Sequence, residues 1–184
     1  ILTGIYPKDG GQIYWNGQPV EINNRNDAAK LGIGVIYQEL SLIPTLTVMQ
    51  NVMLGKEESR AGFVSARKMR KRVSELINKY GFGIKPDAIV ETLTIAQRQT
   101  IEILKALSEE SKLIIMDEPT ASLSTKESDA LFGIIEQLRK DGVSVIYISH
   151  RLEEVYRLSD RLTVLRDGAR VATLTKEQII PAEV

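Results

Sequence analysis

Residues 113–116 form a continuous apolar run, Leu-Ile-Ile-Met, that ends abruptly at Asp117, Glu118 and Pro119. A short apolar run bounded by turn-forming residues is typical of a strand that is buried on both faces of a sheet. Ligands of open α/β sheets bind just outside the carboxyl ends of such strands. Two adjacent carboxylates at this position indicate a site for a magnesium ion and an attacking water, which is phosphate chemistry.

The composition is that of a folded domain and excludes several classes of protein. The 184 residues are 43% hydrophobic and 26% charged, enough for one domain with a real core. Lys plus Arg and Asp plus Glu both number 24, so there is no net basic charge and we expect no nucleic-acid partner. The absence of cysteine excludes disulfides and Cys-based zinc sites. Since no apolar stretch approaches the ~18 residues of a membrane span, any membrane role is expected from outside the bilayer.

The order of apolar patterns and turn residues predicts an α/β domain. Asn16-Gly17 between two short alternating stretches is a strong hairpin signal. Alternating strands and helices in the last part of the chain predict a parallel sheet. We expect hairpins over 12–22 and 161–174, strands over 33–38, 113–116 and 143–148, and helices over 26–31, 94–107, 125–140 and 152–158.

A helical insertion is predicted in the middle of the chain, over residues 45–108. From about 47 to 80 the apolar residues fall at helical spacing in two groups, and we interpret this stretch as helical up to a break at 81–86. The groups are Val48, Val52 and Met53, then Met69, Val73, Leu76 and Ile77. In the helix over 94–107 the candidate buried residues are Ile95, Ile101, Leu104 and Leu107.

Polar residues that could carry chemistry lie just beyond predicted strands or at a helix start. They are Gln38, the segment Leu93-Thr-Ile-Ala-Gln97, Asp117-Glu118 and His150. Each is weak evidence alone, because a glutamine after a strand is usually a surface residue and a histidine at a strand end is more often structural. Their order and spacing together are more specific.

These residues resemble the motifs of the nucleotide-binding domain of ABC transporters, over essentially the whole chain. In order, the resemblance covers the Q-loop at Gln38, the signature at Leu93–Gln97, the Walker B segment with its catalytic glutamate at Leu113–Thr120, the D-loop at Ala121–Ser124 and the switch histidine at His150. It is strongest to the ATPases of bacterial ribose- and galactose-type importers, which typically carry two such domains in tandem. Leu2–Tyr6, Gln38–Pro44 and Tyr147–Arg151 look like the first of those two domains.

The resemblance implies a P-loop NTPase-like ABC ATPase core with a helical subdomain inserted in it. The core would be a mainly parallel sheet with antiparallel β hairpins, built from residues 1–44 and 109–184, and the helical subdomain with the signature would span 45–108. A Gly-x-x-x-x-Gly-Lys-Ser/Thr loop occurs nowhere in the 184 residues. We therefore expect 1–184 to be a partial domain that begins after this Walker A loop and that is inactive alone.

The resemblance also implies a role for each candidate residue. Asp117 and Gln38 would bind Mg²⁺ and, with it, ATP. Glu118 would act as general base toward the attacking water, and His150 would donate to the γ-phosphate or to that water.

The signature segment would bind the ATP held by a second nucleotide-binding domain. Its ligands would be Thr94, Ala96 and Gln97, at a helix N-terminus of the kind that binds phosphate. Ile95 and Ala96 replace two glycines of the usual motif, and their side chains restrict close approach to phosphate.

The function implied is an ATPase that powers import of a sugar through a membrane permease. Its partners would be a second nucleotide-binding domain, permease subunits and, indirectly, a periplasmic or extracellular sugar-binding protein. Its place would be peripheral, at the cytoplasmic face of the bacterial membrane. Two alternatives stay open: a soluble ABC-type ATPase acting on ribosomes or DNA, and a non-catalytic dimerisation module.

Overall fold

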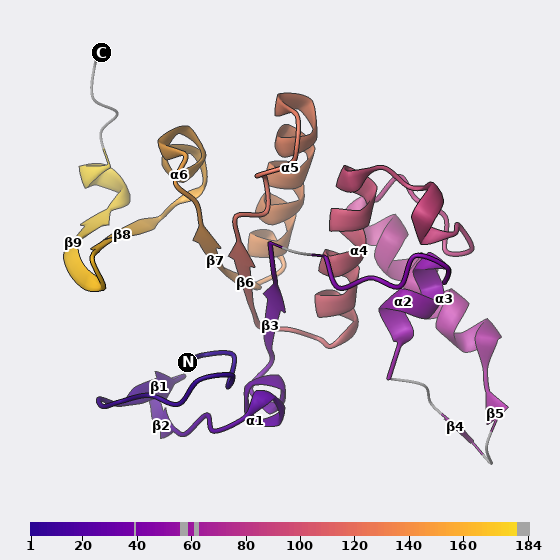
Figure 1. Ribbon diagram of the computed structural model, residues 1–184, viewed down its shortest axis with the longest axis horizontal. Helices are drawn as coiled ribbons and strands as arrows, with labels where there is room; N and C mark the ends of the chain where they lie inside the picture. Colours follow the sequence, from indigo (N-terminus) through magenta and orange to yellow (C-terminus); the bar gives the residue numbers. More distant parts are fainter. Residues whose placement is uncertain (39, 56–58, 61–62, 180–184) are drawn as a thin grey trace.

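A parallel sheet of three strands lies at the centre of the protein, in the order β3 (Ile33–Ile36), β6 (Leu113–Asp117) and β7 (Ser144–Ile148) (Figure 1). The computed structural model describes residues 1–38, 40–55, 59–60 and 63–179. Residues 39, 56–58, 61–62 and 180–184, which belong to the ranges expected above, lie outside the described part. Ile36 pairs with Met116, and Asp117 pairs with Ile148, so the carboxyl ends of the three strands are aligned.

The apolar run of β6 is buried on both faces, as its sequence predicts. Ile114 and Met116 belong to the larger hydrophobic core, while Leu113 and Ile115 belong to a smaller one on the opposite face. Side chains alternate between the two faces of a strand, so only a run without polar residues satisfies both cores. In β7, at the sheet edge, every second residue is exposed.

Helices cover one face of the sheet. Figure 1 shows α4 (Ile95–Ser108) and α5 (Thr125–Lys140) on this side, with α2 (Val48–Met53) and α3 (Ala66–Tyr80) beyond α4. Their apolar faces build the larger core, which is why the helical spacing in the sequence identified most of its members. Among the described residues, no helix is long and apolar enough to cross a lipid bilayer.

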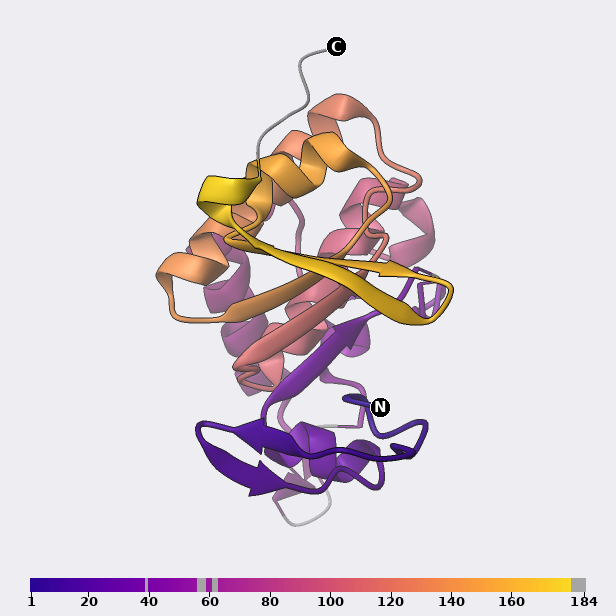
Figure 2. The same ribbon diagram turned by 90° about the vertical axis from the view of Figure 1, so that its left-hand side faces the viewer.

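Two antiparallel hairpins lie on the other side of the sheet. They are β1 (Ile13–Trp15) with β2 (Gln18–Val20) and β8 (Arg161–Arg166) with β9 (Ala169–Thr175). Figure 2 shows β8 and β9 crossing in front of the sheet and the indigo β1–β2 hairpin below it. Their turns are Asn16-Gly17 and Asp167-Gly168, in which all four residues have positive φ. This backbone twist matches that of the flanking strands, so both predicted hairpins are confirmed.

Short helical elements complete the fold. They are α1 (Arg25–Lys30) before β3, α6 (Leu152–Leu158) after β7, and the 3₁₀ turns η1 (Val90–Thr92) and η2 (Lys176–Gln178). The central parallel sheet, with helices on one face and hairpins on the other, confirms the predicted α/β class.

Two expectations for the helical region are wrong. The helical interpretation of 47–80 fails in its middle, where α2 ends at Met53 and the short strands β4 (Ser59–Arg60) and β5 (Phe63–Val64) pair before α3 begins. Gly55, with a φ of 74°, adopts a left-handed backbone that does not continue a helix. Ile95 is 53% exposed because it is the first residue of α4 and points away from the core.

Candidate functional site

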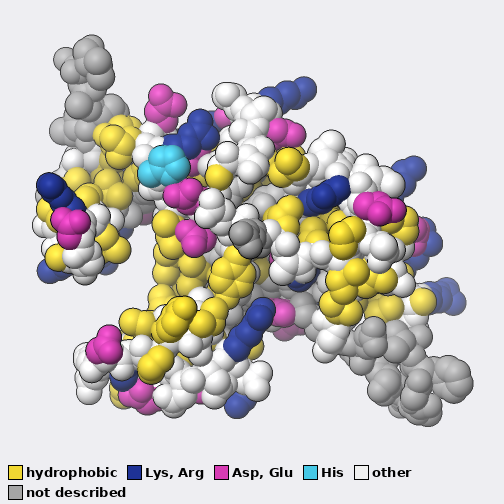
Figure 3. All heavy atoms as spheres, viewed as in Figure 1, with side chains coloured by type: hydrophobic (Ala, Val, Ile, Leu, Met, Phe, Trp, Pro, Cys, Tyr) yellow, Lys and Arg dark blue, Asp and Glu magenta, His cyan; other side chains and the backbone are white. Residues whose placement is uncertain are grey.

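The ends of β6 and β7 bring Glu118 and His150 into contact. The amide of Glu118 donates to the carbonyl of Ile148 at 3.0 Å, which adds one bond beyond the last strand pair. His150 follows two residues later, and its Nδ1 lies 3.0 Å from Oε1 of Glu118. Figure 3 shows the histidine, the only one in the chain, at the surface beside acidic side chains. The pair can accept and donate a proton at one exposed position.

The backbone at Glu118 has an unusual conformation. Its φ is 44°, in the left-handed region that residues other than glycine seldom occupy. Two hydrogen bonds hold the backbone in this conformation. The Glu118 amide donates to the carbonyl of Ile148, and the Ala121 amide donates to the Glu118 carbonyl at 3.2 Å. Strained backbone of this kind is found most often at functional positions.

Asp117 and Gln38 lie at the carboxyl ends of neighbouring strands. Asp117 is the last residue of β6, and Gln38 is two residues beyond the end of β3. In the part of the chain that the structure describes, the Asp117 carboxylate has no hydrogen-bond or ion-pair partner, so its oxygens are free to bind a ligand.

The side-chain oxygens of Asp117 and Gln38 fit a magnesium ion that is bound together with phosphates. Mg²⁺ is usually held by one or two carboxylates, waters and substrate phosphates and not by an all-protein cage. The described residues contain no group of three or more His, Cys, Asp or Glu side chains placed to hold a metal. Asp117 and Gln38 would thus supply part of a coordination shell, and waters and phosphate oxygens would supply the rest.

The predicted signature residues form the start of α4. Thr94 is its N-cap, and its hydroxyl accepts from the amide of Gln97 at 3.3 Å while the Gln97 side chain accepts from the Thr94 amide at 3.1 Å. The amides of Ile95 and Ala96, at the first two positions of the helix, make no hydrogen bond to any described residue. Since α4 runs antiparallel to the strands, its start and the ends of β3 and β6 lie toward the same end of the molecule (Figure 1).

A buried carboxylate that the sequence analysis missed lies behind the Glu118–His150 pair. Glu154, in the first turn of α6, is 5% exposed and accepts hydrogen bonds from Thr120 and Tyr147 at 2.9 and 2.8 Å. Burial, together with the Glu154 carboxylate, raises the pKa of the Tyr147 hydroxyl well above its ordinary range. The sequence shows two consecutive glutamates in this turn, and only the packing of Val155 and Leu158 distinguishes the buried one.

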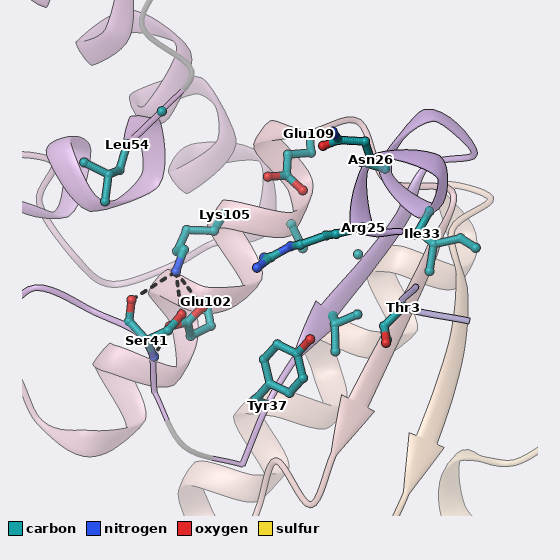
Figure 4. A pocket seen from close by; sticks show the side chains of 16 residues that line it. Thr3, Arg25, Asn26, Ile33, Tyr37, Ser41, Leu54, Glu102, Lys105 and Glu109 are labelled. Carbon is teal, nitrogen blue, oxygen red and sulfur yellow. Dashed lines mark hydrogen bonds and ion pairs between the residues drawn. The ribbon is translucent and has the colours of Figure 1, made fainter. Parts of the chain in front are cut away.

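A cleft of about 310 Å³ lies between α1 and β3 on one side and α2 and α4 on the other. Figure 4 shows the Arg25 side chain pointing from α1 into this cleft toward α4. At one wall the amide of Ser41, three residues after Gln38, donates to the buried carboxylate of Glu102 at 2.8 Å, and Lys105 lies 3.0 Å from the same carboxylate. The segment that follows β3 is thus attached to α4.

A family model described as ABC transporter matches residues 1–121, about two thirds of the chain. The chain belongs to the ABC transporter family. Membership agrees with the fold and with the order of polar residues beyond β3, β6 and β7. It does not by itself test the role of any of those residues.

Individual relatives and structures agree with the family. The chain is similar to ribose import ATP-binding protein RbsA 3 of Rubrobacter xylanophilus, with 42% identity over all of this chain and 37% of that protein. It therefore spans little more than a third of the length of the curated relatives it matches. A solved ATP-binding cassette of an ABC transporter has a TM-score of 0.84 at 23% identity, over 97% of this chain and 75% of that one. The dimeric structure of a bacterial ABC transporter cassette has a TM-score of 0.76 at 24% identity, over 95% and 77%. At these identities the two structures show the fold alone.

Proposed function

We propose that this chain is part of the ATP-binding and hydrolysing component of an ABC importer for a sugar of the ribose class. The observation that carries the proposal is the contact of Glu118 with His150 beside the free carboxylate of Asp117, at the aligned ends of β6 and β7. Similarity to a ribose import ATP-binding protein over the whole chain supports the sugar and the direction of transport.

The site residues have distinct proposed roles in hydrolysis. Glu118 orients the attacking water and accepts its proton, while His150 donates to the γ-phosphate or to that water. Asp117 and Gln38 hold the Mg²⁺ of Mg-ATP, which neutralises charge on the phosphates when bound. The 3.0 Å contact places Glu118 and His150 at hydrogen-bond distance from each other.

The start of α4 is proposed to bind ATP on a second nucleotide-binding domain. Thr94, Ala96 and Gln97 form an exposed or half-exposed helix N-terminus with two amides available to an anion. No described contact joins them to Glu118 or His150, so a partner domain is needed to bring a signature to this ATP site. The similar solved cassette that is dimeric supports this arrangement.

The cleft between the two parts of the molecule is proposed to receive the permease at the cytoplasmic face of the membrane. Residues 1–44 and 109–184 are the core in this proposal, and 45–108 is the helical subdomain. Leu54, 49% exposed at the rim of the cleft, is a suitable probe. Leu54→Cys should cross-link to cytoplasmic loops of the permease in the full transporter. Links that form only from a cysteine in β8 or β9 would contradict the docking side.

The transport function is tested by reconstitution. The full-length protein with its permease and sugar-binding protein should hydrolyse ATP and move ribose-class sugars into vesicles, and sugar uptake should require ATP. Hydrolysis that responds to ribosomes or DNA and not to the permease would favour a soluble ABC ATPase instead.

The 184 residues alone are proposed to hydrolyse no ATP. They contain no Gly-x-x-x-x-Gly-Lys-Ser/Thr loop, which supplies the amides and lysine that hold the β- and γ-phosphates. Hydrolysis above background by this purified segment, abolished by Glu118→Gln, would contradict the proposal.

A further inference from the structure

Four donors converge on the buried carboxylate of Glu154. The hydroxyl of Thr120 lies 2.9 Å from each of its oxygens, and the hydroxyls of Tyr147 and Ser149 donate to Oε2 at 2.8 and 3.0 Å. A guanidinium nitrogen of Arg151 lies 2.8 Å from Oε1. A buried carboxylate is tolerated only when it is paired and hydrogen-bonded in this way.

The donors come from both segments that carry the proposed catalytic pair. Thr120 follows Glu118 by two residues in the turn after β6. Ser149 and Arg151 are the two neighbours of His150 in the segment after β7, and the Arg151 amide also donates to the Ser149 hydroxyl at 3.0 Å. Glu154 thus joins the turn after β6, which carries Glu118, to the segment after β7, which carries His150.

His150 has little else to hold it. Its side chain is 72% exposed, and its one hydrogen-bond or ion-pair partner among the described residues is Glu118. The position of the imidazole is therefore set by the backbone of residues 149–151, and the side chains of Ser149 and Arg151 on either side of it contact the Glu154 carboxylate. Four side chains contact this one carboxylate, so the attachment is firm.

We propose that Glu154 is a positioning residue that keeps Glu118 and His150 at hydrogen-bond distance, an inference that rests on the proposed function for its effect on hydrolysis. It touches neither substrate nor reacting atoms. Its carboxylate fixes the turn that carries the base to the segment that carries the histidine. Outer-shell partners of metal-ligating residues typically affect activity roughly 10- to 100-fold, and we expect an effect of the same order here.

The kinetic test compares Glu154→Ala and Glu154→Gln with Glu153→Ala in the full-length protein. Glu153 is the exposed neighbour in the same turn of α6 and is the matched control. Glu154→Ala should lower kcat per folded molecule roughly 10- to 100-fold with little change in KM for ATP. Glu154→Gln, which keeps the size and part of the hydrogen bonding, should fall between this variant and wild type. Glu153→Ala should behave as wild type.

A double-mutant cycle separates positioning from general destabilisation. If Glu154 acts through His150, adding Glu154→Ala to His150→Ala should cost little further activity. Multiplicative losses, an effect on KM alone, or an unchanged kcat would overturn the proposal. If Glu154→Ala does not fold, the same comparison with Glu154→Gln decides.

A spectroscopic test distinguishes failure of this inference from failure of the proposed function. In the full-length protein with labelled histidine, the ring signal of residue 150 is assigned by its loss in His150→Gln. Its nuclear Overhauser contact with the Glu118 side chain should be present in wild type and Glu153→Ala and absent in Glu154→Ala. If the contact persists in Glu154→Ala, positioning is overturned whatever the ATPase assay gives. If it is lost in a protein without ATPase activity, positioning holds and the proposed function fails.

Discussion

The ends of β6 and β7 and the start of α4 carry the two groups of proposed ATP-binding residues, and they are organised in opposite ways. At the strand ends, Glu118 and His150 meet across 32 residues of sequence, and Glu154 joins their segments from behind. At the start of α4, the side chains of Thr94 and Gln97 each accept from the other's backbone amide, across three residues. The first group is assembled by tertiary structure, while the second is assembled by its own helix.

This difference indicates how each group works. Long-range contacts hold the strand-end residues in fixed mutual positions, as chemistry at a reacting centre requires. Local capping makes the start of α4 stable without reference to the rest of the site, so it can be presented to a partner as a unit. Substitutions at the strand ends should therefore affect turnover, and those at α4 should affect association.

The largest expected effect is from Glu118→Gln in the full-length protein. Glutamine keeps the size and most hydrogen bonding of glutamate but takes no proton, so kcat should fall ~10²–10⁴-fold while ATP still binds. Asp117→Asn should instead weaken binding of Mg-ATP itself. Paired binding and turnover assays separate the two defects. Near-normal turnover and transport by Glu118→Gln would mean that Glu118 is not the base or that this site is not the working one.

The next largest effect is expected at Glu102, which connects α4 to the segment that follows β3. Glu102→Ala removes the buried acceptor of the Ser41 amide, which should lower the free energy of unfolding by ~1–3 kcal/mol. It also removes one of the two attachments of Ser41 to α4 and leaves the bonds from Lys105, so stimulation of hydrolysis by the permease should weaken. Glu136→Ala, an exposed glutamate of α5, is the control and should change neither quantity. If the permease still stimulates hydrolysis fully in Glu102→Ala, the contact between Glu102 and Ser41 does not couple α4 to the segment after β3.

A smaller effect is expected from Thr94→Ala at the start of α4. Loss of the N-cap hydroxyl should cost ~1 kcal/mol in unfolding experiments. If this helix end binds ATP on a partner, ATP-dependent dimerisation measured by sedimentation should weaken as well. Thr94→Ser keeps the cap and should restore both. Weakened hydrolysis with unchanged dimerisation would break the distinction between the two regions.

The smallest effect is expected at Asp141, a second connection between helical region and core. Its carboxylate accepts from Tyr80 and Gln137 and pairs with Lys79 at 2.8 Å. The hydrogen bond from Lys79 is the largest cause that lowers the pKa of Asp141 below its ordinary value of 3.8, and the hydrogen bond from Tyr80 is the second largest. The stabilisation is therefore fully present above that ordinary pKa and is lost as the pH falls through the lower folded value. Asp141→Asn should lower the unfolding midpoint slightly at pH 7, and this difference should vanish in acid; a difference that persists there would rule out the ionised carboxylate as its source.

Much of the fold could be predicted because local patterns and tertiary structure agree. The uninterrupted apolar run of β6 has only one consistent placement, between two cores. Asn16-Gly17 and Asp167-Gly168 adopt the positive φ angles that hairpins need. The helical interpretation of residues 47–80 was wrong because two helices with the same apolar spacing look like one in the sequence. Gly55, which lies between them, was a visible signal of a break.

The candidate site could be predicted only in part. Polar residues beyond strand ends can be found from sequence, because the ends of neighbouring parallel strands meet at one edge. The 3.0 Å contact of Glu118 and His150 depends on register, which the sequence does not show. Glu154 could not be found, since Glu153 beside it has the same chemistry and only packing buries one of them. Their functional roles stay predictions.

The left-handed backbone of Glu118 constrains what evolution or a mutant library can place there. With a φ of 44°, position 118 disfavours β-branched residues on backbone grounds alone, whereas glycine and asparagine fit it well. Protein abundance and catalysis would therefore rank the twenty residues differently in a saturation scan. We expect the variants that accumulate best to be those that relieve the backbone, such as glycine and asparagine, and not those that keep a proton acceptor. In the proposed mechanism, glutamate at position 118 combines a proton acceptor with an unfavourable backbone conformation.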